Sequence, residues 1–195
     1  MNIQLRELRK SYDGIAVLDG ISASFDSGFY GLCGTSGGGK TTLLRIICGL
    51  LAPDSGSVTF SGDPTFSYAF QEPRLFPSLT VRQNVTLISP ERDPDELLLA
   101  LDLTNAAALY PDELSGGMKT RAGIARCLSK QADVYLLDEP TGGQDPQHAD
   151  AIVQAIRKYA HNAVCITVSH DAGLLTSCCE HILTLSSGKL TSATP

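Results

Sequence analysis

Hydrophobic and polar positions along the chain form two kinds of segment, short β-rich runs and longer runs with helical spacing. Turn residues stand at the junctions, as in Asp26-Ser27-Gly28 and Asp54-Ser55-Gly56. The pattern predicts strands at residues 21–25, 29–33, 57–60, 67–70, 134–137, 163–168 and 181–185. It predicts helices at residues 41–50, from residue 115 onward, at residues 146–159 and, briefly, between the last two strands. Strands that alternate with helices in this way indicate an α/β fold.

The middle of the chain departs from this alternation. Residues 80–110 are predominantly helical in pattern, and we expect breaks at Pro90 and Pro94 because proline removes a backbone donor from a helix. This part of the chain is therefore expected to form a subdomain of its own.

A glycine-rich segment lies between the predicted strand at 29–33 and the predicted helix at 41–50, and it matches the pattern GxxxxGK[ST]. Glycines let the backbone curl so that its N–H groups face phosphate oxygens, and the helix N-terminus that follows favours negative charge. Lys40 is expected to reach the β- and γ-phosphates, and the Thr41 hydroxyl suits Mg²⁺, which takes oxygen ligands. The predicted nucleotide-binding residues are Gly34, Thr35, Ser36, Gly37, Gly38, Gly39, Lys40, Thr41 and Thr42.

Two carboxylates, Asp138 and Glu139, follow directly after the apolar run 134–137. The carboxyl ends of parallel strands form the edge at which open α/β sheets bind ligands. We expect Asp138 to contact Mg²⁺ either directly or through a group that itself binds the ion. We expect Glu139 to orient and deprotonate the water that attacks the γ-phosphate. The alternative is a solvated strand end, in which case Glu139→Gln would leave ATP turnover unchanged.

A second glycine-lined helix start occurs at Leu114-Ser115-Gly116-Gly117-Met118, where Ser115 can cap the helix. Such an N-terminus offers backbone N–H groups to phosphate. One ATP already has its phosphates in the loop before Lys40, so this additional phosphate-binding surface points to a second subunit.

Composition narrows the class of partners. The formal net charge of −6 leaves no basic face for nucleic acid. No apolar run approaches the length that spans a bilayer, no secretory leader opens the chain, and we expect one soluble domain over residues 1–195. The six cysteines form no CxxC pair, so we expect buried thiols in a reducing cytosol and assign no role to Cys178 and Cys179.

The motifs and their order resemble those of the ATP-binding cassette (ABC) ATPases, over about residues 5–188. The resemblance implies a P-loop NTPase fold with an ABC-type core sheet, an antiparallel β subdomain and a helical subdomain at about residues 72–114. It implies ATP and Mg²⁺ as ligands. In that family two cassettes pack head to tail, so Ser115 and Gly117 are expected to act on the ATP of a second ABC subunit, most simply in a homodimer.

The resemblance also gives roles to three residues that would be unremarkable alone. Tyr12 matches the aromatic residue that stacks on adenine, and Gln71 matches the glutamine that touches Mg²⁺ and the attacking water. His170, in Val168-Ser169-His170-Asp171, matches the switch histidine near the γ-phosphate. The expected catalytic residues are thus Glu139, His170 and Gln71, and the expected metal contacts are Thr41, Gln71 and Asp138.

Two positions depart from the family pattern. Met118 stands where Gln is usual, and Gly142-Gly143-Gln144-Asp145 stands where Ser-Ala-Leu-Asp is usual. Methionine cannot make the hydrogen bonds of an amide, and paired glycines loosen a segment that crosses the expected dimer interface. We therefore expect slower turnover than is usual in the family.

The function implied is ATP-driven dimer closure and hydrolysis, transmitted through the residues between Gln71 and Leu114 to a transmembrane permease at the cytoplasmic face of the membrane. Residues 70–77 look like the same segment in ATPases of nitrate, sulfonate and taurine importers, which favours uptake of a small anion and would add an extracytoplasmic solute-binding protein. The alternatives are a soluble ABC ATPase in macromolecular assembly such as iron–sulfur cluster building, a small-molecule kinase, and a module that holds ATP without hydrolysing it.

Overall fold

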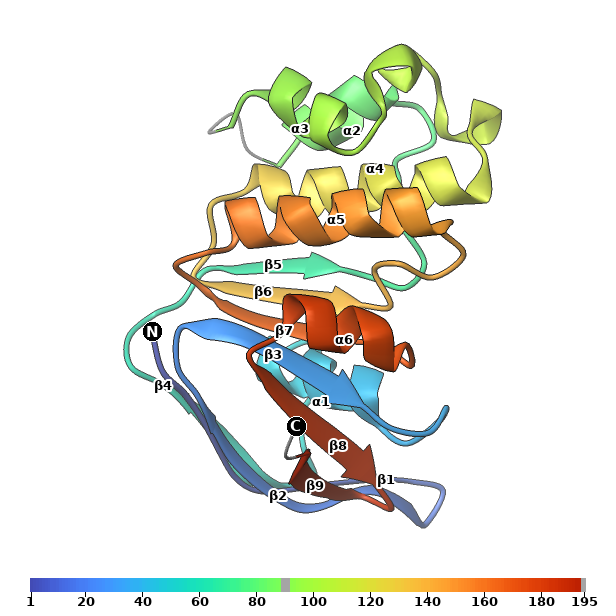
Figure 1. The fold of residues 1–195 in the computed structure, drawn as a ribbon. Helices are drawn as coiled ribbons and strands as arrows, with labels where there is room; N and C mark the ends of the chain where they lie inside the picture. The colour runs from blue at the N-terminus through green and yellow to red at the C-terminus, as the bar shows by residue number, and fades with distance from the viewer. Residues whose placement is uncertain (89–91, 194–195) are drawn as a thin grey trace.

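A six-stranded sheet forms the centre of the molecule (Figure 1). The computed structural model describes residues 1–88 and 92–193. The order across the sheet is β5-β6-β7-β3-β8-β9, in which the first five strands are parallel and β9 pairs antiparallel with β8. The strands are β3 (Gly28–Cys33), β5 (Phe66–Ala69), β6 (Val134–Asp138), β7 (Val164–Val168), β8 (His181–Ser186) and β9 (Lys189–Ala193).

The two central strands β6 and β7 are buried along their whole length. Continuous apolar runs rich in Val, Ile and Leu are typical of parallel strands that are covered on both faces. Val134 and Leu136 belong to one hydrophobic core, whereas Tyr135 and Leu137 belong to another, because successive side chains of a strand point to opposite faces. The sheet therefore separates two cores.

Helices cover both faces of the sheet. α4 (Gly116–Ser129) and α5 (Pro146–Tyr159) lie side by side over β5 and β6 in Figure 1, and their buried residues belong to the first core. α1 (Lys40–Ile47) packs in the second core, and α6 (Ala172–Cys178) contacts β3. The bounds predicted for α5 are confirmed, but α1 does not reach residue 50, because Gly49 takes a positive φ of 73°.

A separate three-stranded antiparallel sheet, in the order β2-β1-β4, closes the second core. Its strands are β1 (Ile3–Tyr12), β2 (Ile15–Phe25) and β4 (Ser55–Phe60). The hydrophobic pattern predicted only residues 21–25 and 57–60 of this sheet. It missed β1 because the register shifts between Leu5 and Leu8, so that the buried side chains Ile3, Leu5 and Leu8 do not keep a period of two.

The turn expected at residues 54–56 is wrong in part, because Ser55 and Gly56 already belong to β4, in which Ser55 pairs with Arg9. Gly56 has a φ of 87°, and a Cβ atom at this position would lie 2.4 Å from the carbonyl oxygen of Glu7. The glycine therefore permits a close approach of two strands at the register shift between Arg6 and Arg9 rather than a chain reversal.

The segment between β5 and α4 carries short helices, as the pattern predicted. These are α2 (Val81–Thr86), α3 (Pro94–Ala100) and two 3₁₀ turns at Thr104–Ala106 and Pro111–Glu113. Pro94 begins α3 instead of breaking a helix, since proline fits the first helical turn; Pro90 lies outside the described residues.

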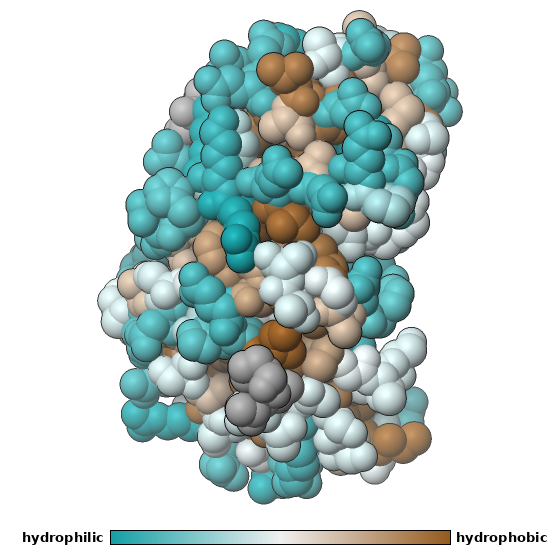
Figure 2. Space-filling model, viewed as in Figure 1, coloured by the Kyte–Doolittle hydropathy of each residue, from teal (hydrophilic) through white to brown (hydrophobic). Residues whose placement is uncertain are grey.

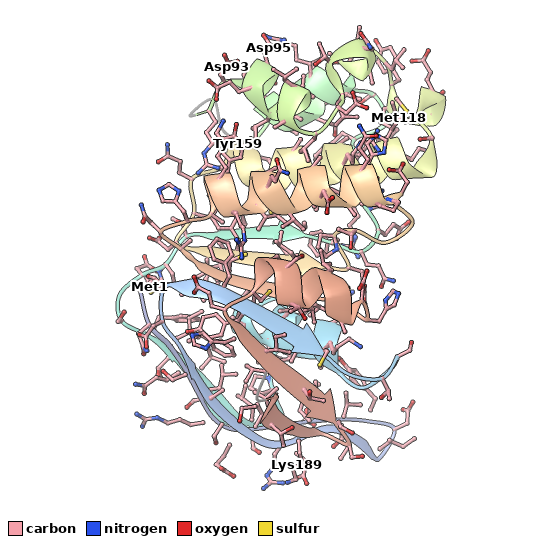
Figure 3. The ribbon with its side chains drawn as sticks, in the orientation of Figure 1. Met1, Asp93, Asp95, Met118, Tyr159 and Lys189 are labelled. Atoms are coloured by element: carbon pink, nitrogen blue, oxygen red, sulfur yellow. The ribbon has the colours of Figure 1, made fainter. Side chains whose placement is uncertain are left out.

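Arg92 ties the start of α3 to the core helices by donating to the carbonyls of Leu128 and Tyr159, at 2.5 and 2.7 Å. Figure 3 labels Tyr159 at the end of α5 and Asp93 at the start of α3. The face shown in Figure 2 is mostly hydrophilic, with small and separate hydrophobic areas. Within residues 1–88 and 92–193, the structure contains no helix that combines the length and the apolar character needed to cross a membrane.

Candidate nucleotide-binding and catalytic site

The carboxyl ends of four parallel strands meet at one edge of the central sheet. The loop of residues 34–39 follows β3, Glu139 follows β6, His170 comes two residues after β7, and Gln71 comes two residues after β5. These strands point the same way in Figure 1, with their ends toward α1 and the loop before it. Parallel pairing thus brings together residues as far apart in the sequence as Gly34 and His170.

The loop of residues 34–39 is shaped by glycines that no other residue could replace easily. Gly34 has a φ of 141°, and a Cβ there would lie 2.1 Å from the carbonyl oxygen of Leu185 in the neighbouring strand. Gly39 has a φ of 95° and caps the N-terminus of α1. The buried Lys40 ammonium donates to the carbonyl oxygens of Gly34 and Thr35, both at 2.9 Å. The Lys40 side chain therefore folds back onto the start of the loop and holds the loop in a closed curve.

Asp138 is the buried carboxylate of the site, and one of its oxygens, Oδ2, accepts hydrogen bonds from two hydroxyl groups. Thr41 Oγ1 donates to it at 2.8 Å and Tyr68 Oη at 3.3 Å. Burial raises the pKa of Asp138, while both hydrogen bonds act in the opposite direction. Tyr68 is also shielded from water, and this burial, together with the nearby charge of Asp138, raises the pKa of the Tyr68 hydroxyl. Sequence reasoning missed Tyr68, because it reaches Asp138 only through the pairing of β5 with β6.

These groups suit Mg²⁺. A hydroxyl oxygen and a carboxylate oxygen lie 2.8 Å apart beside the phosphate loop, and Mg²⁺ selects oxygen ligands from one or two protein groups together with substrate phosphates. Gln71 lines the same cavity and adds a further amide oxygen.

Glu139 is held through its oxygen Oε2, which accepts two hydrogen bonds and also lies close to an imidazole nitrogen. His170 Nδ1 lies 2.9 Å away, the Ser169 hydroxyl donates at 3.3 Å, and the backbone N–H of His170 donates at 3.4 Å. Glu139 takes a positive φ of 51°, and its own N–H donates to Val168 at 2.9 Å. Sequence analysis assigned no role to Ser169, although this residue directly precedes His170. The His170 side chain is 77% exposed, whereas that of Glu139 is 13% exposed.

A cavity of about 710 Å³ unites most of the predicted site. Its lining includes Tyr12, Ser36, Gly37, Gly38, Gly39, Lys40, Thr41, Thr42, Gln71, Asp138, Glu139 and His170. Gly34 and Thr35 are absent from this lining but bind Lys40 through their carbonyl groups. The structure therefore places the phosphate loop, both carboxylates and the expected adenine-stacking Tyr12 around one space.

Ser115 and Gly117 lie elsewhere, beside a second cavity of about 620 Å³. The Ser115 side chain accepts the N–H of Met118 at 3.2 Å, so its predicted role as the N-cap of α4 is confirmed. Ser115 and Gly116 are exposed. We call the backbone and side chains of residues 115–117 the 115–117 surface. This surface does not reach the first cavity of the same chain.

Comparisons with known proteins agree with this geometry. A family model described as ABC transporter matches residues 18–142. The aliphatic sulfonates import ATP-binding protein SsuB of Corynebacterium glutamicum is 36% identical over 201 residues, which cover 96% of this chain and 81% of that protein. The intermembrane phospholipid transport system ATP-binding protein MlaF of Escherichia coli K12 is 33% identical, with coverage of 96% and 80%. The dimeric post-hydrolysis structure of the ATP-binding cassette MJ0796, bound to ADP and Pi, has a TM-score of 0.86 at 25% identity and covers 99% of both chains.

Proposed function

Because this chain belongs to the ABC transporter family of ATP-binding domains, we propose that it is the ATPase subunit that powers solute transport through a separate membrane permease. One observation carries the proposal. The phosphate loop, the Asp138–Glu139 pair and His170 lie at the ends of three different strands, β3, β6 and β7, and line a single cavity. An ATP hydrolase requires these groups together, and neither a solvated strand end nor a simple binding module accounts for the two hydrogen bonds and the His170 contact that hold Glu139.

The side chains divide the work of hydrolysis. Lys40 can exchange its two carbonyl partners for phosphate oxygens without leaving the loop. Glu139 accepts a proton from water while the water oxygen forms a bond to the γ-phosphorus and the bond to the ADP oxygen breaks. Ser169 and His170 orient the carboxylate for this step. Bound Mg²⁺, held by Thr41, Asp138 and Gln71, would neutralise phosphate charge.

We infer that two copies of the chain work together. The 115–117 surface presents backbone N–H groups at the N-terminus of a 14-residue helix, yet it faces away from the cavity that holds Lys40. The related MJ0796 cassette is a dimer with ADP and Pi bound. Ser115 and Gly117 of one copy would thus complete the nucleotide site of the other.

The permease is proposed to dock beside the helical region at about residues 72–114. A groove of about 310 Å³ runs between this region and the core, lined by Leu50, Phe66, Tyr68, Phe70, Ile88 and Arg126, among others. Leu50, Leu87 and Ile88 expose at least half of their side-chain surface near it. Apolar side chains gathered in a groove suit a partner helix. Docking there would hold the chain at the cytoplasmic face of the membrane.

The solute is proposed to be small and imported, most simply an anion. The support is the similarity of residues 70–77 to importer ATPases together with the named sulfonate import relative. The phospholipid-system relative has nearly the same identity to this chain, so the cargo is set by the permease and by any solute-binding protein rather than by the ATPase site.

The hydrolytic proposal is tested by phosphate release from the purified chain. We expect Glu139→Gln to lower turnover by about 10²- to 10³-fold while fluorescent ATP still binds, because the amide cannot accept the proton. Lys40→Ala should instead abolish binding. Equal turnover in the parent and Glu139→Gln would reject the catalytic assignment.

The transport proposal is tested by the partners of the tagged chain in its own cell, extracted with mild detergent and identified by mass spectrometry. Recovery of a polytopic membrane protein supports the transporter. Recovery of soluble partners alone would reject it in favour of an assembly ATPase.

A further inference from the structure

The segment that follows Glu139 is anchored to the start of α4 by the side chain of Gln144. We call Gly142-Gly143-Gln144-Asp145 the 142–145 segment. Gln144 Nε2 donates to the carbonyl oxygen of Gly117 at 3.3 Å, and Gln144 Oε1 accepts from Arg121 Nη1 at 3.1 Å. One amide thus joins the 142–145 segment to two successive turns of the helix that carries the 115–117 surface.

Only a carboxamide can make both contacts. The amide nitrogen must face a carbonyl oxygen and the amide oxygen must face a guanidinium group, which also fixes the orientation of Gln144. The leucine that is usual at this position in the family can make neither hydrogen bond. A glutamate could accept from Arg121 but could not donate to Gly117.

The contacts are close and partly shielded from water. Arg121 is 6% exposed. A Cβ atom on Gly117 would touch both amide atoms of Gln144 at 3.4 Å and Arg121 Nη1 at 3.7 Å. The two hydrogen bonds therefore lie in the half-buried wall of the second cavity, where water competes with them less than at a fully exposed surface.

The rest of the 142–145 segment is also fixed, despite its glycines. The N–H of Gly142 donates to the carbonyl of Glu139 at 3.1 Å, and the N–H of Gln144 donates to that of Thr141 at 3.1 Å. Gly143 supplies the positive φ of 70° that the turn needs, and Asp145 caps α5 by accepting the N–H of His148. The loosening expected from paired glycines is thus opposed by hydrogen bonds on both sides.

We propose that Gln144 is a positioning residue that couples the catalytic Glu139 to the 115–117 surface of the same chain. The inference rests on the proposed function, in which that surface contacts the ATP of the partner subunit. Through Gln144, a shift of Glu139 and the turn after it would move Gly117. Conversely, when the 115–117 surface closes on the ATP of the partner subunit, the same contacts would bring Glu139 into its catalytic position.

The test compares phosphate release by the parent, Gln144→Glu and Gln144→Leu over a range of ATP concentrations. We expect each Gln144 variant to lower kcat about tenfold and to bring the Hill coefficient for ATP close to one, since loss of a shielded hydrogen bond misplaces a catalytic segment. Fluorescent nucleotide should bind each isolated variant as it binds the parent. Gln154→Leu, on the exposed side of α5, is the matched control and should behave as the parent.

The outcomes separate coupling from simple stabilisation. A lower melting temperature with an unchanged Hill coefficient and kcat would overturn the inference, and so would variants that match the parent. Gln144→Glu is informative because it keeps the size of the side chain and the bond to Arg121. A parent that hydrolyses ATP but does not respond to Gln144 changes overturns this inference alone, whereas a parent without hydrolysis overturns the proposed function as well.

Discussion

Single atoms decide how Asp138 presents the oxygen that we propose to contact Mg²⁺. Its Oδ2 accepts from Thr41 and from Tyr68, and only the first of these residues belongs to a recognisable motif. Tyr68 is stacked on Phe70, with ring centroids 4.2 Å apart, so its ring is held while its hydroxyl points at the carboxylate. Tyr68 therefore acts on Asp138 from the strand that leads to Gln71.

Removing this hydroxyl should weaken the use of Mg²⁺. We expect Tyr68→Phe to raise the Mg²⁺ concentration that gives half-maximal ATPase activity by about threefold to tenfold, because a lost hydrogen bond is worth about 1 kcal/mol and its loss raises the pKa of Asp138 further. Titration of phosphate release with Mg²⁺ measures the effect.

Tyr30→Phe is the matched control for this change. It also loses one hydrogen bond, from the N–H of Asp26, but lies away from the site. The same Mg²⁺ dependence in both variants would contradict a role for Tyr68.

Among single residues, the sequence predicted those that belong to contiguous motifs. It missed those that meet their partners only through strand pairing or through packing against a helix. Lys40, Asp138 and Glu139 stand in patterns that a single stretch of sequence displays. Tyr68 and Gln144 act on partners 70 and 27 positions away, and such distances close only once the order of the strands and the packing of the helices are known.

Among the elements, the junction of α5 with the turn after α3 contains an ionisable link. His148, in the first turn of α5, places Nδ1 2.5 Å from Asp145 Oδ2 and Nε2 3.1 Å from Asp102 Oδ2. The Asp145 and Asp102 hydrogen bonds raise the pKa of His148. The link joins the helical region to the core on the side of the second cavity.

The stability of the chain should therefore depend on pH through His148. Because its folded-state pKa is raised, the stabilisation is complete below the unfolded value of about 6.5 and disappears as pH rises through the folded value. We expect the difference in melting temperature between the parent and His148→Gln to be largest near pH 5.5 to 6 and to shrink toward pH 9. Differential scanning calorimetry measures it.

His161→Gln serves as the control, since His161 Nδ1 donates to the carbonyl oxygen of Lys158, which is a neutral acceptor near the end of α5. A melting-temperature difference that stays constant with pH would show that His148 stabilises the junction by packing alone.

Buried strands and capped helices were the elements that the sequence predicted well. β6, β7 and α5 have a strong pattern and clear boundaries. β1 escaped prediction because a register shift interrupts its alternation, and Pro94 was misread because proline both starts and stops helices. Local pattern alone does not distinguish these two uses.

At the scale of the whole molecule, the central sheet divides two large hydrophobic cores, and a small third cluster lies between α5 and α6 in the described residues. The nucleotide cavity lies at one edge of the sheet, and the 115–117 surface lies beside a second cavity. The order of motifs predicted this fold class, since the phosphate loop and the two carboxylates must follow parallel strands. The order of those strands across the sheet could not be deduced, because the same succession of strands and helices along the chain is compatible with many strand orders.

At this scale we expect ATP to control assembly. Glu139→Gln, which holds ATP without cleaving it, should run at twice the mass of the chain when ATP and Mg²⁺ are present and as a single chain without nucleotide. Light scattering after size-exclusion chromatography measures the mass. The physical reason is that the two nucleotides add phosphate contacts across the interface that the free chains lack.

Ser115→Arg in the same background tests where the contact lies. A bulky cation at this exposed helix N-terminus should prevent the dimer while each chain still binds fluorescent ATP. A dimer that persists in this double variant would place the interface elsewhere.

The left-handed backbone of Glu139 has a consequence for anyone who selects this protein for heat resistance. A non-glycine residue in that conformation costs about 1 to 3 kcal/mol, and the cost falls for Gly and Asn. Libraries screened only for folding would thus be drawn toward Gly or Asn at position 139, and the most robust clones would have lost the carboxylate that we propose to be catalytic. Thermostable variants of this enzyme need a screen in which hydrolysis, and not solubility, decides survival.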